Sequence, residues 1–290
     1  MRHLKWLAPV IAALLLLSGC GGGNEPTEME YGEIEDEAVP AAAFPAEDGG
    51  PGTYEAPPLL DSAFHEDKAE GKNGVQIDMS AVSDGYVGVS AVSDSRLKFQ
   101  VMKEDSTYTY DLSPEGTPSI IPLQSGDGSY RFRVMENVGE SKYVEKYAAS
   151  CTVALTDEYQ PYLRPNDYVR FSVDSECVRA AAELAKGARS ALDVVSSVFD
   201  YVCGTVSYDR EKAAAVKSMY LPDPDETLRL GSGICFDYAS LVAAMLRSQG
   251  IPAKVIFGYV SPNGLYHAWN MFYTEQTGWV TVSYEVKEDS

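Results

Sequence analysis

The sequence predicts an α+β protein in which an all-β, sandwich-like domain precedes a domain of helices packed on an antiparallel sheet. Alternating polar and apolar residues over 96–101 and 129–134, with turn clusters between such runs, indicate short antiparallel strands. Apolar residues at helical spacing over 175–204 indicate two amphipathic helices. An apolar helix is then predicted to begin at Cys235, and three strand-like segments follow it.

The N-terminus has the pattern of an export signal. Arg2, His3 and Lys5 precede an apolar run over 6–17 that is too short for a transmembrane helix. The run ends at Cys20 in Leu-Ser-Gly-Cys, which resembles the lipobox of bacterial lipoproteins. That resemblance implies a lipoprotein signal peptide over 1–19, diacylglycerol on Cys20, and an extracytoplasmic protein held on the bacterial cell membrane by lipid. The alternative is a plain signal peptide with an incidental cysteine.

Residues 20–70 are predicted to be the lipidated cysteine and an acidic, disordered linker. Residues 21–70 hold fourteen Asp and Glu against one lysine, in a chain of formal net charge −20. Such a segment cannot bury enough apolar surface to offset its loss of conformational entropy. We interpret it as a spacer, and the acidic balance argues against a nucleic-acid partner.

The remaining residues are long enough for two domains, predicted over 71–158 and 159–290. The first carries the alternating strands and no cluster of reactive side chains, so we interpret it as a packing or spacing domain, with a binding role left open. Cys151, Cys177 and Cys203 can form one disulfide at most, and their spacing matches no metal motif. Each is read as an apolar filler.

The helix that begins at Cys235 is well marked at both ends. Residues 231–233, Gly-Ser-Gly, are predicted to cap it, while Gly250 fits the left-handed position after its C-terminus and Pro252 stops it. Its body is apolar on nearly all sides and should be packed centrally. Strands are predicted over 253–260, 267–273 and 278–285.

Cys235 and His267 are the candidate catalytic residues. A thiol is a nucleophile as thiolate, and its pKa falls at a helix N-terminus and beside an imidazolium. The chain holds three histidines. His3 lies in the predicted signal and His65 in the acidic segment, so a histidine base for Cys235 within the folded domain must be His267.

The segment 208–282 resembles the transglutaminase-like domain of bacterial secreted proteins, a branch of the papain-like cysteine-nucleophile fold. The resemblance rests on four stretches: 233–239 (GICFDYA), 245–253 (MLRSQGIPA), 257–259 (FGY) and 267–269 (HAW). It implies that Cys235 attacks an amide carbonyl, that His267 takes its proton and later protonates the leaving amine, and that water or an amine resolves the thioester. It also implies that no metal or organic cofactor is required.

One position departs from the family pattern. The family places an acidic or amide residue on the strand after the histidine, often as Trp-x-x-x-Asp, but here Trp279 is followed four residues later by Ser283. The third member of the triad is therefore not identified. The aspartate lies beyond Ser290 in a longer chain, or catalysis has been lost. Glu285 and Asp289 are weaker substitutes.

Two functions therefore follow from the sequence. The first is a lipid-anchored cysteine peptidase or acyltransferase acting on peptide or Gln and Asn side-chain amides of an envelope or extracellular protein. The second is a catalytically inactive binding or scaffold lipoprotein that keeps the fold and the cleft. The sequence does not identify the substrate, nor separate hydrolysis from transamidation, because that choice depends on the access of water to the thioester.

Overall fold

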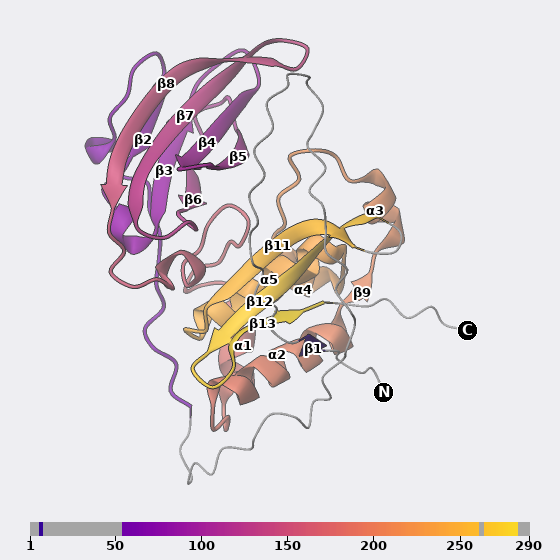
Figure 1. Ribbon diagram of the computed structural model, residues 1–290. Helices are drawn as coiled ribbons and strands as arrows, with labels where there is room; N and C mark the ends of the chain where they lie inside the picture. The colour runs from indigo at the N-terminus through magenta and orange to yellow at the C-terminus, as the bar shows by residue number, and fades with distance from the viewer. Residues whose placement is uncertain (1–5, 8–53, 261–263, 284–290) are drawn as a thin grey trace, which may run out of the picture.

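The computed structural model describes residues 6–7, 54–260 and 264–283, and within them the chain builds two hydrophobic cores (Figure 1). One core lies in a β-sandwich and the other among helices and a second antiparallel sheet. The α+β class predicted from the sequence is confirmed. No helix in the described part of the chain has the length and apolar character needed to cross a bilayer.

Two antiparallel sheets form the β-sandwich. The smaller has the order β2 (Val75–Asp78), β3 (Tyr86–Ala91), β6 (Ser119–Pro122). The larger has the order β5 (Ser106–Leu112), β4 (Leu97–Lys103), β7 (Gly128–Gly139), β8 (Lys142–Val153). Two short 3-10 helices accompany them, η2 (Glu66–Lys68) and η3 (Val82–Asp84). Inward side chains of both sheets share one core, as strand alternation requires.

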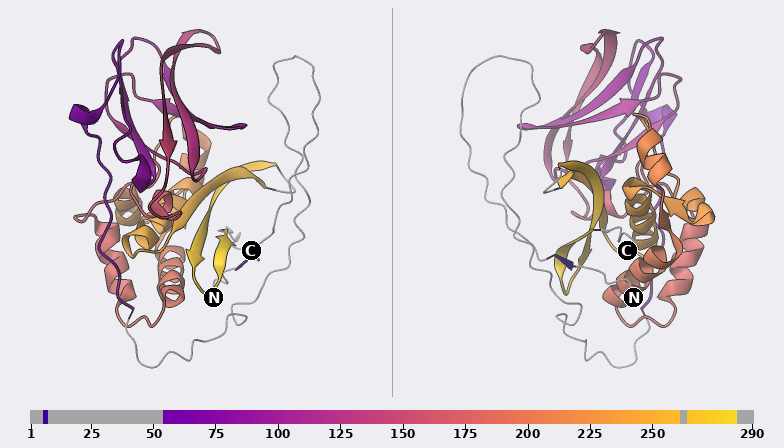
Figure 2. Two further views of the ribbon diagram at one scale, coloured as in Figure 1. Left: turned by 60° about the vertical axis from the view of Figure 1, so that its left-hand side comes forward. Right: turned by 90° about the vertical axis from the view of Figure 1, so that its right-hand side faces the viewer.

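The second part stacks helices on one face of a sheet (Figure 2). Its sheet has the order β1 (Trp6–Leu7), β13 (Gly278–Val282), β12 (Leu265–Thr274), β11 (Ala253–Val260). Between the sandwich and β11 the chain forms η4 (Gln160–Tyr162), α1 (Glu176–Ala185), α2 (Ala191–Thr205), β9 (Ser207–Tyr208), α3 (Arg210–Ala215), α4 (Pro224–Leu230), β10 (Ser232–Gly233) and α5 (Cys235–Ser248).

The two-residue strand β1 lies inside the segment predicted to be a signal peptide. It pairs antiparallel with β13, Trp6 opposite Val282 and Leu7 opposite Thr281. Cleavage before Cys20 would remove this pairing and leave β13 as the edge strand. Cys20 itself lies outside the described residues, and so does most of the predicted signal.

Helix α5 is the central element of the second core. Residues 237–248 are all buried, as its nearly uniform apolar sequence predicted. Gly250 follows in the left-handed region at φ 75°, and the Ile251 N–H reaches back to the Leu246 carbonyl. These are the features of the predicted glycine stop. Helices α1, α2 and α4 pack around α5, which rests on β11 and β12.

The linker prediction is wrong for residues 54–70, which are ordered against both parts. The Tyr54 hydroxyl donates to the Gln249 carbonyl at 2.5 Å, and Tyr54 and Leu59 pack against the helical core. Farther along, His65 Nδ1 lies 3.1 Å from Asp78 Oδ2. The acidic composition did not indicate these contacts, because a few apolar and aromatic side chains suffice to hold a short segment on an existing surface.

Asn270 ties three elements of the helical part together. It is fully buried on β12, and its side-chain amide donates to the carbonyls of Ala239 on α5, at 2.9 Å, and Lys254 on β11, at 3.1 Å. A buried amide that is hydrogen-bonded in this way fixes how the helix sits on the sheet. His267 stands three residues earlier on the same strand, so the position of the candidate base depends on this contact.

We expect Asn270→Ala to lower the free energy of unfolding by about 1–3 kcal/mol, because it leaves buried polar groups without partners. Urea denaturation followed by circular dichroism measures this. Lys142→Ala, at an exposed position of β8, is the control and should stay within about 0.5 kcal/mol of wild type. Equal midpoints for the two variants would show that Asn270 does not hold α5 on the sheet.

Candidate active site

Cys235 is the first residue of α5, where the backbone N–H groups of a helix lack intrahelical partners. The predicted cap over 231–233 is corrected by the structure: Ser232 and Gly233 pair with β9, and the cap comes from Asp237. Its Oδ2 accepts a hydrogen bond from the Ile234 N–H at 2.8 Å. A side chain on Gly233 would place its Cβ 2.6 Å from that of Asp237, so this approach requires glycine.

Asp237 is a fully buried carboxylate with a complete set of partners. Lys212 places its Nζ 2.7 Å from Asp237 Oδ2, and the Tyr220 hydroxyl donates to Asp237 Oδ1. Lys212 also donates to the Tyr220 hydroxyl at 2.7 Å. A buried carboxylate needs such pairing to stay charged. The network therefore fastens α3 and the loop after it to the head of α5, beside the candidate nucleophile.

The Cys235 thiol is half-buried and its pKa is raised, chiefly because burial disfavours the thiolate. Hydrogen bonds to the sulfur from the backbone N–H groups of Ala268, Phe236 and Cys235 itself act in the opposite direction, and the charge of Asp237 adds to the rise. The lowered pKa expected from the helix N-terminus is therefore not found. Desolvation outweighs the N–H groups, and no charge on an imidazole contributes to the shift.

His267 lies near the start of β12, and its imidazole is directed toward Ser283. The His267 Nε2 and Ser283 Oγ are 3.5 Å apart, a long hydrogen bond, and the ring stacks on Trp269 at 6.2 Å between centroids. Burial lowers the pKa of His267, which favours the neutral imidazole. Ser283, at the position where the resemblance implies an orienting acid, thus contacts the imidazole. Glu285 and Asp289 lie outside the described residues.

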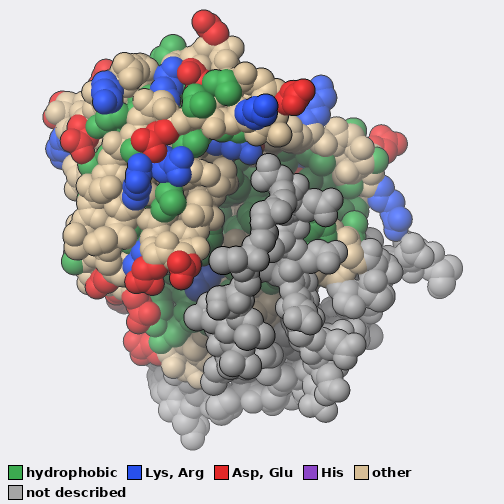
Figure 3. Space-filling view, turned by 45° about the horizontal axis from the view of Figure 1, so that its top comes forward, with side chains coloured by type: hydrophobic (Ala, Val, Ile, Leu, Met, Phe, Trp, Pro, Cys, Tyr) green, Lys and Arg blue, Asp and Glu red, His purple; other side chains and the backbone are tan. Residues whose placement is uncertain are grey.

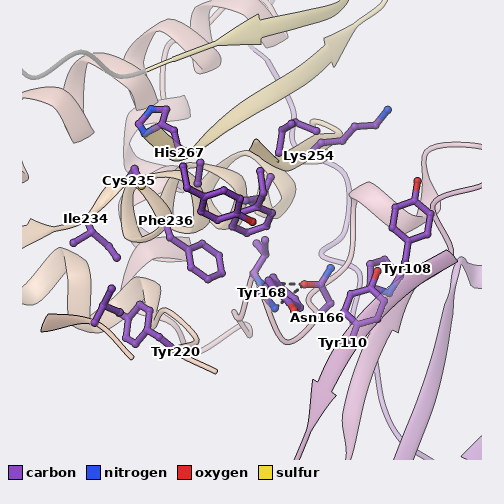
Figure 4. A pocket seen from close by; sticks show the side chains of 18 of the residues that line it. Tyr108, Tyr110, Asn166, Tyr168, Tyr220, Ile234, Cys235, Phe236, Lys254 and His267 are labelled. Atoms are coloured by element: carbon purple, nitrogen blue, oxygen red, sulfur yellow. Dashed lines mark hydrogen bonds between the residues drawn. The ribbon is translucent and has the colours of Figure 1, made fainter. Parts of the chain in front are cut away.

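Cys235 and His267 line the same end of one cavity of about 820 Å³ (Figure 4). The strand brings its backbone to the thiol, since the Ala268 N–H bonds the sulfur. Among residues 54–260 and 264–283, no hydrogen bond joins the thiol to the imidazole. The alternation along β12 explains this, because Ala268, Asn270 and Phe272 occupy the buried face and His267 the half-buried one.

The cavity runs from this end to the β-sandwich, along a chain of aromatic rings. Tyr168 is its centre, with ring centroids 5.8 Å from Phe236, 6.0 Å from Phe257 and 5.8 Å from Tyr110 on β5. Tyr168 also packs against both cores. Figure 3 shows hydrophobic side chains gathered in the hollow between the two parts. The sequence did not reveal this wall, because none of these tyrosines lies within a motif.

The other described cysteines do not line the cavity that contains Cys235. In the described part of the chain none of Cys151, Cys177 and Cys203 forms a disulfide, and burial raises the pKa of the Cys151 and Cys177 thiols. No group of three or more His, Cys, Asp or Glu in the described part of the chain could hold a metal ion.

Comparison with known proteins finds similarity over the helical part. Residues 178–284 match the family model described as the transglutaminase-like superfamily. The matched range includes both Cys235 and His267. A protein-glutamine gamma-glutamyltransferase of Pseudomonas aeruginosa is 38% identical over 63 residues, which is 18% of this chain and 9% of that protein. An uncharacterized protein of Mycobacterium leprae is 28% identical over 149 residues, covering 44% of this chain and 46% of its own. The chain spans less than half the length of these curated relatives.

Solved structures of lower similarity include a proposed cysteine protease of Cytophaga hutchinsonii and the transglutaminase of red sea bream. The first has 17% sequence identity and a TM-score of 0.39, covering 67% of this chain and 68% of its own. The second has 11% identity and a TM-score of 0.32, covering 68% of this chain and 48% of its own.

The contact between His267 and Ser283 gives a prediction for Ser283→Asp. A carboxylate beside the imidazole favours imidazolium, so the pKa of His267 should rise. We expect alkylation of Cys235 by iodoacetamide at pH 7 to accelerate about tenfold or more, because imidazolium in turn favours thiolate. In the wild type the alkylation rate should keep rising as the pH is increased beyond 9, the ordinary pKa of a thiol. The reason is that burial raises the pKa of Cys235.

The matched control is Ser283→Asn, which keeps a polar group of similar size without charge and should leave the profile near that of wild type. Mass spectrometry of tryptic peptides assigns the alkylation to Cys235 rather than to another thiol. A Ser283→Asp protein with the wild-type profile would show that position 283 does not govern the imidazole.

Proposed function

We propose that this protein is a cysteine enzyme, extracytoplasmic and lipid-anchored, that acts on peptide bonds or on Gln and Asn side-chain amides. The match of residues 178–284 to the transglutaminase-like superfamily model supports this proposal. The observation that carries the proposal is the convergence of Cys235, at the head of a buried helix, and His267 on one cavity within the matched region.

The reaction begins when His267 takes the proton of the Cys235 thiol and the sulfur attacks the amide carbonyl carbon. The carbon–nitrogen bond then breaks, the imidazolium returns its proton to the leaving amine, and the acyl group remains on sulfur as a thioester. Backbone N–H groups at the head of α5 stabilise the oxyanion of the tetrahedral intermediate. Water or a second amine attacks the thioester, losing a proton to the imidazole, and the thiol is regenerated.

In this mechanism the resting pair is neutral, and the reactive form is reached when His267 turns toward the sulfur. The directions of the two pKa shifts support a neutral pair, since burial raises that of Cys235 and lowers that of His267. Hydrogen bonds between catalytic groups are often long or absent before substrate binds. Substrate that fills the cavity would also remove water from the pair and strengthen their interaction.

Turnover by the purified protein tests the proposal. We expect a Gln-containing peptide offered with a fluorescent primary amine to be cleaved, deamidated or labelled with the amine, and Cys235→Ala to lower that rate about a thousandfold or more. Cys151→Ala, which removes a free thiol of the β-sandwich, should keep the wild-type rate. Intact mass spectrometry should detect the thioester on Cys235. A purified protein that forms no acyl adduct with peptide or with an activated ester would contradict an enzymatic role.

A binding or scaffold role is the second candidate, favoured by Ser283 in place of the orienting acid. Without that acid the imidazole is poorly held, and catalysis falls by orders of magnitude in enzymes of this type. In that case peptides would bind to the cavity without turnover, and Cys235→Ala would bind them as well as wild type.

The lipid anchor forms a separate part of the proposal, based on the Leu-Ser-Gly-Cys pattern that ends at Cys20. We expect the N-terminal peptide of the mature protein to begin at Cys20 and to carry a diacylglyceryl group, as measured by mass spectrometry after detergent extraction. Cys20→Ala should release the protein from the membrane fraction. An unmodified N-terminal peptide would favour the plain signal peptide.

A further inference from the structure

The cavity has a charge opposite to that of the chain around it. Acidic residues outnumber basic ones by 43 to 23 over the whole sequence. Among the residues that the structure describes, no Asp or Glu lines the cavity, whereas Lys217, Arg247 and Lys254 do. In the described part of the chain, none of these three cations forms an ion pair with a carboxylate. The cavity therefore offers a positive field without built-in counter-ions.

Arg247 is the most buried of the three cations. It lies in the last turn of α5, with 4% of its surface exposed. Its Nε and Nη2 donate to the Ala253 carbonyl, at 3.0 and 2.8 Å, and Nη1 donates to the Arg164 carbonyl at 2.7 Å. Burial lowers its pKa to about 9, so the guanidinium is charged at pH 7. A buried charge paired with carbonyls alone gains from an added anion.

Lys254, on β11, presents a second cation at the same end of the cavity. Its Nζ lies 3.8 Å from the ring centroid of Trp279 and 4.4 Å from that of Tyr162, a cation–π arrangement that holds the ammonium in place. The charge of Glu158 attracts this ammonium and opposes the lowering of its pKa by burial. Glu158 does not line the cavity. Figure 4 shows Lys254 and His267 at separate positions around the cavity wall.

Neutral donors complete this end. The Tyr110 hydroxyl accepts a hydrogen bond from the Gln124 side-chain amide at 3.2 Å, which leaves its own proton to donate. The Tyr162 hydroxyl donates to the Gln124 carbonyl at 3.1 Å. Two cations and a hydroxyl donor are the chemistry that recognises a carboxylate.

The end beside Cys235 is apolar by contrast. Leu265, Tyr266 and Phe257 are 61%, 57% and 36% exposed on the hairpin of β11 and β12. Met219 is 47% exposed in the loop after α3, and all four line the cavity. Exposed apolar groups gathered around one opening indicate a binding surface for apolar groups.

We propose that the cavity binds an extended acyl-donor peptide whose apolar residues lie beside Cys235 and whose carboxylate lies about five residues away, at Arg247 and Lys254. Arg247 follows Cys235 by twelve residues on α5, a distance of roughly 18 Å along the helix. An extended peptide spans about 3.3 Å per residue, which gives the spacing of five. The name acyl donor rests on the proposed function, whereas the carboxylate subsite does not.

Peptide binding to the full chain carrying Cys235→Ala tests the subsite without turnover. The probes are fluorescent peptides with a central Gln flanked by Phe and Leu, and with Glu five residues to one side or the other. Matched peptides carry Gln in place of that Glu, or a free rather than amidated C-terminal carboxylate at the same spacing. By fluorescence polarisation at low salt, we expect a Glu or carboxylate peptide to bind about tenfold more tightly than its uncharged match.

Variants of Lys254 assign the preference to this end of the cavity. In the Cys235→Ala background, Lys254→Met should reduce the preference to about twofold or less, while Lys254→Arg should restore it. Lys142→Met, on the exposed edge of the sandwich, should leave it unchanged. Equal affinity for charged and uncharged peptides, or binding of neither, would overturn the subsite. A preserved preference in Cys235→Ala together with no turnover by wild type would instead reject the proposed function alone.

Discussion

The burial of α5 is the constraint on which the rest of the second core depends. A helix that is apolar on nearly all sides has to be surrounded, and α1, α2, α4 and the sheet supply that environment. Its first turn is the part that the cavity reaches, so Cys235 is half-buried while the body of the helix is fully enclosed. The same burial that fixes the sulfur also withdraws water from it, and this desolvation raises the thiol pKa.

The buried carboxylate of Asp237 likewise helps to position Cys235 while raising the pKa of its thiol. Asp237 caps α5 and is held by Lys212 and Tyr220, but its charge disfavours a thiolate two residues away. Lys212 offsets part of that field, since a paired carboxylate acts as a dipole at a distance. The cap that orders the first turn of α5 thus lowers the reactivity of the Cys235 thiol. An orienting acid at position 283 would be one way to restore that reactivity.

Much of the fold could be predicted from local patterns. The strand predicted over 253–260 has those bounds in β11, and Gly250 takes the left-handed conformation assigned to it. The helices around 175–204 and the sandwich strands were also found, because 3.6- and 2-residue periods record which face is buried. The resemblance to transglutaminase-like domains located Cys235 and His267 on one cavity, and it placed Ser283 beside the imidazole.

The features that could not be predicted from the sequence depend on contacts between distant segments of the chain. No sequence pattern indicates the surroundings of Arg247 and Lys254, and only the packed structure shows one buried among carbonyls and the other between two rings. The role of Asp237 as cap depended on Gly233 making room for it. The order of residues 54–70 was missed because composition reports average polarity, whereas Tyr54 and Leu59 act individually.

The aromatic wall through Tyr168 and Tyr110 has an evolutionary consequence. One side of the cleft is supplied by a sandwich that contributes no nucleophile and no base. Recombination that replaced this sandwich by another would alter which molecules fit, while the helix and strand that carry the chemistry stayed unchanged. Tyr110 and its neighbours on β5 are therefore positions where selection can diversify recognition among homologous proteins while Cys235 and His267 stay unchanged.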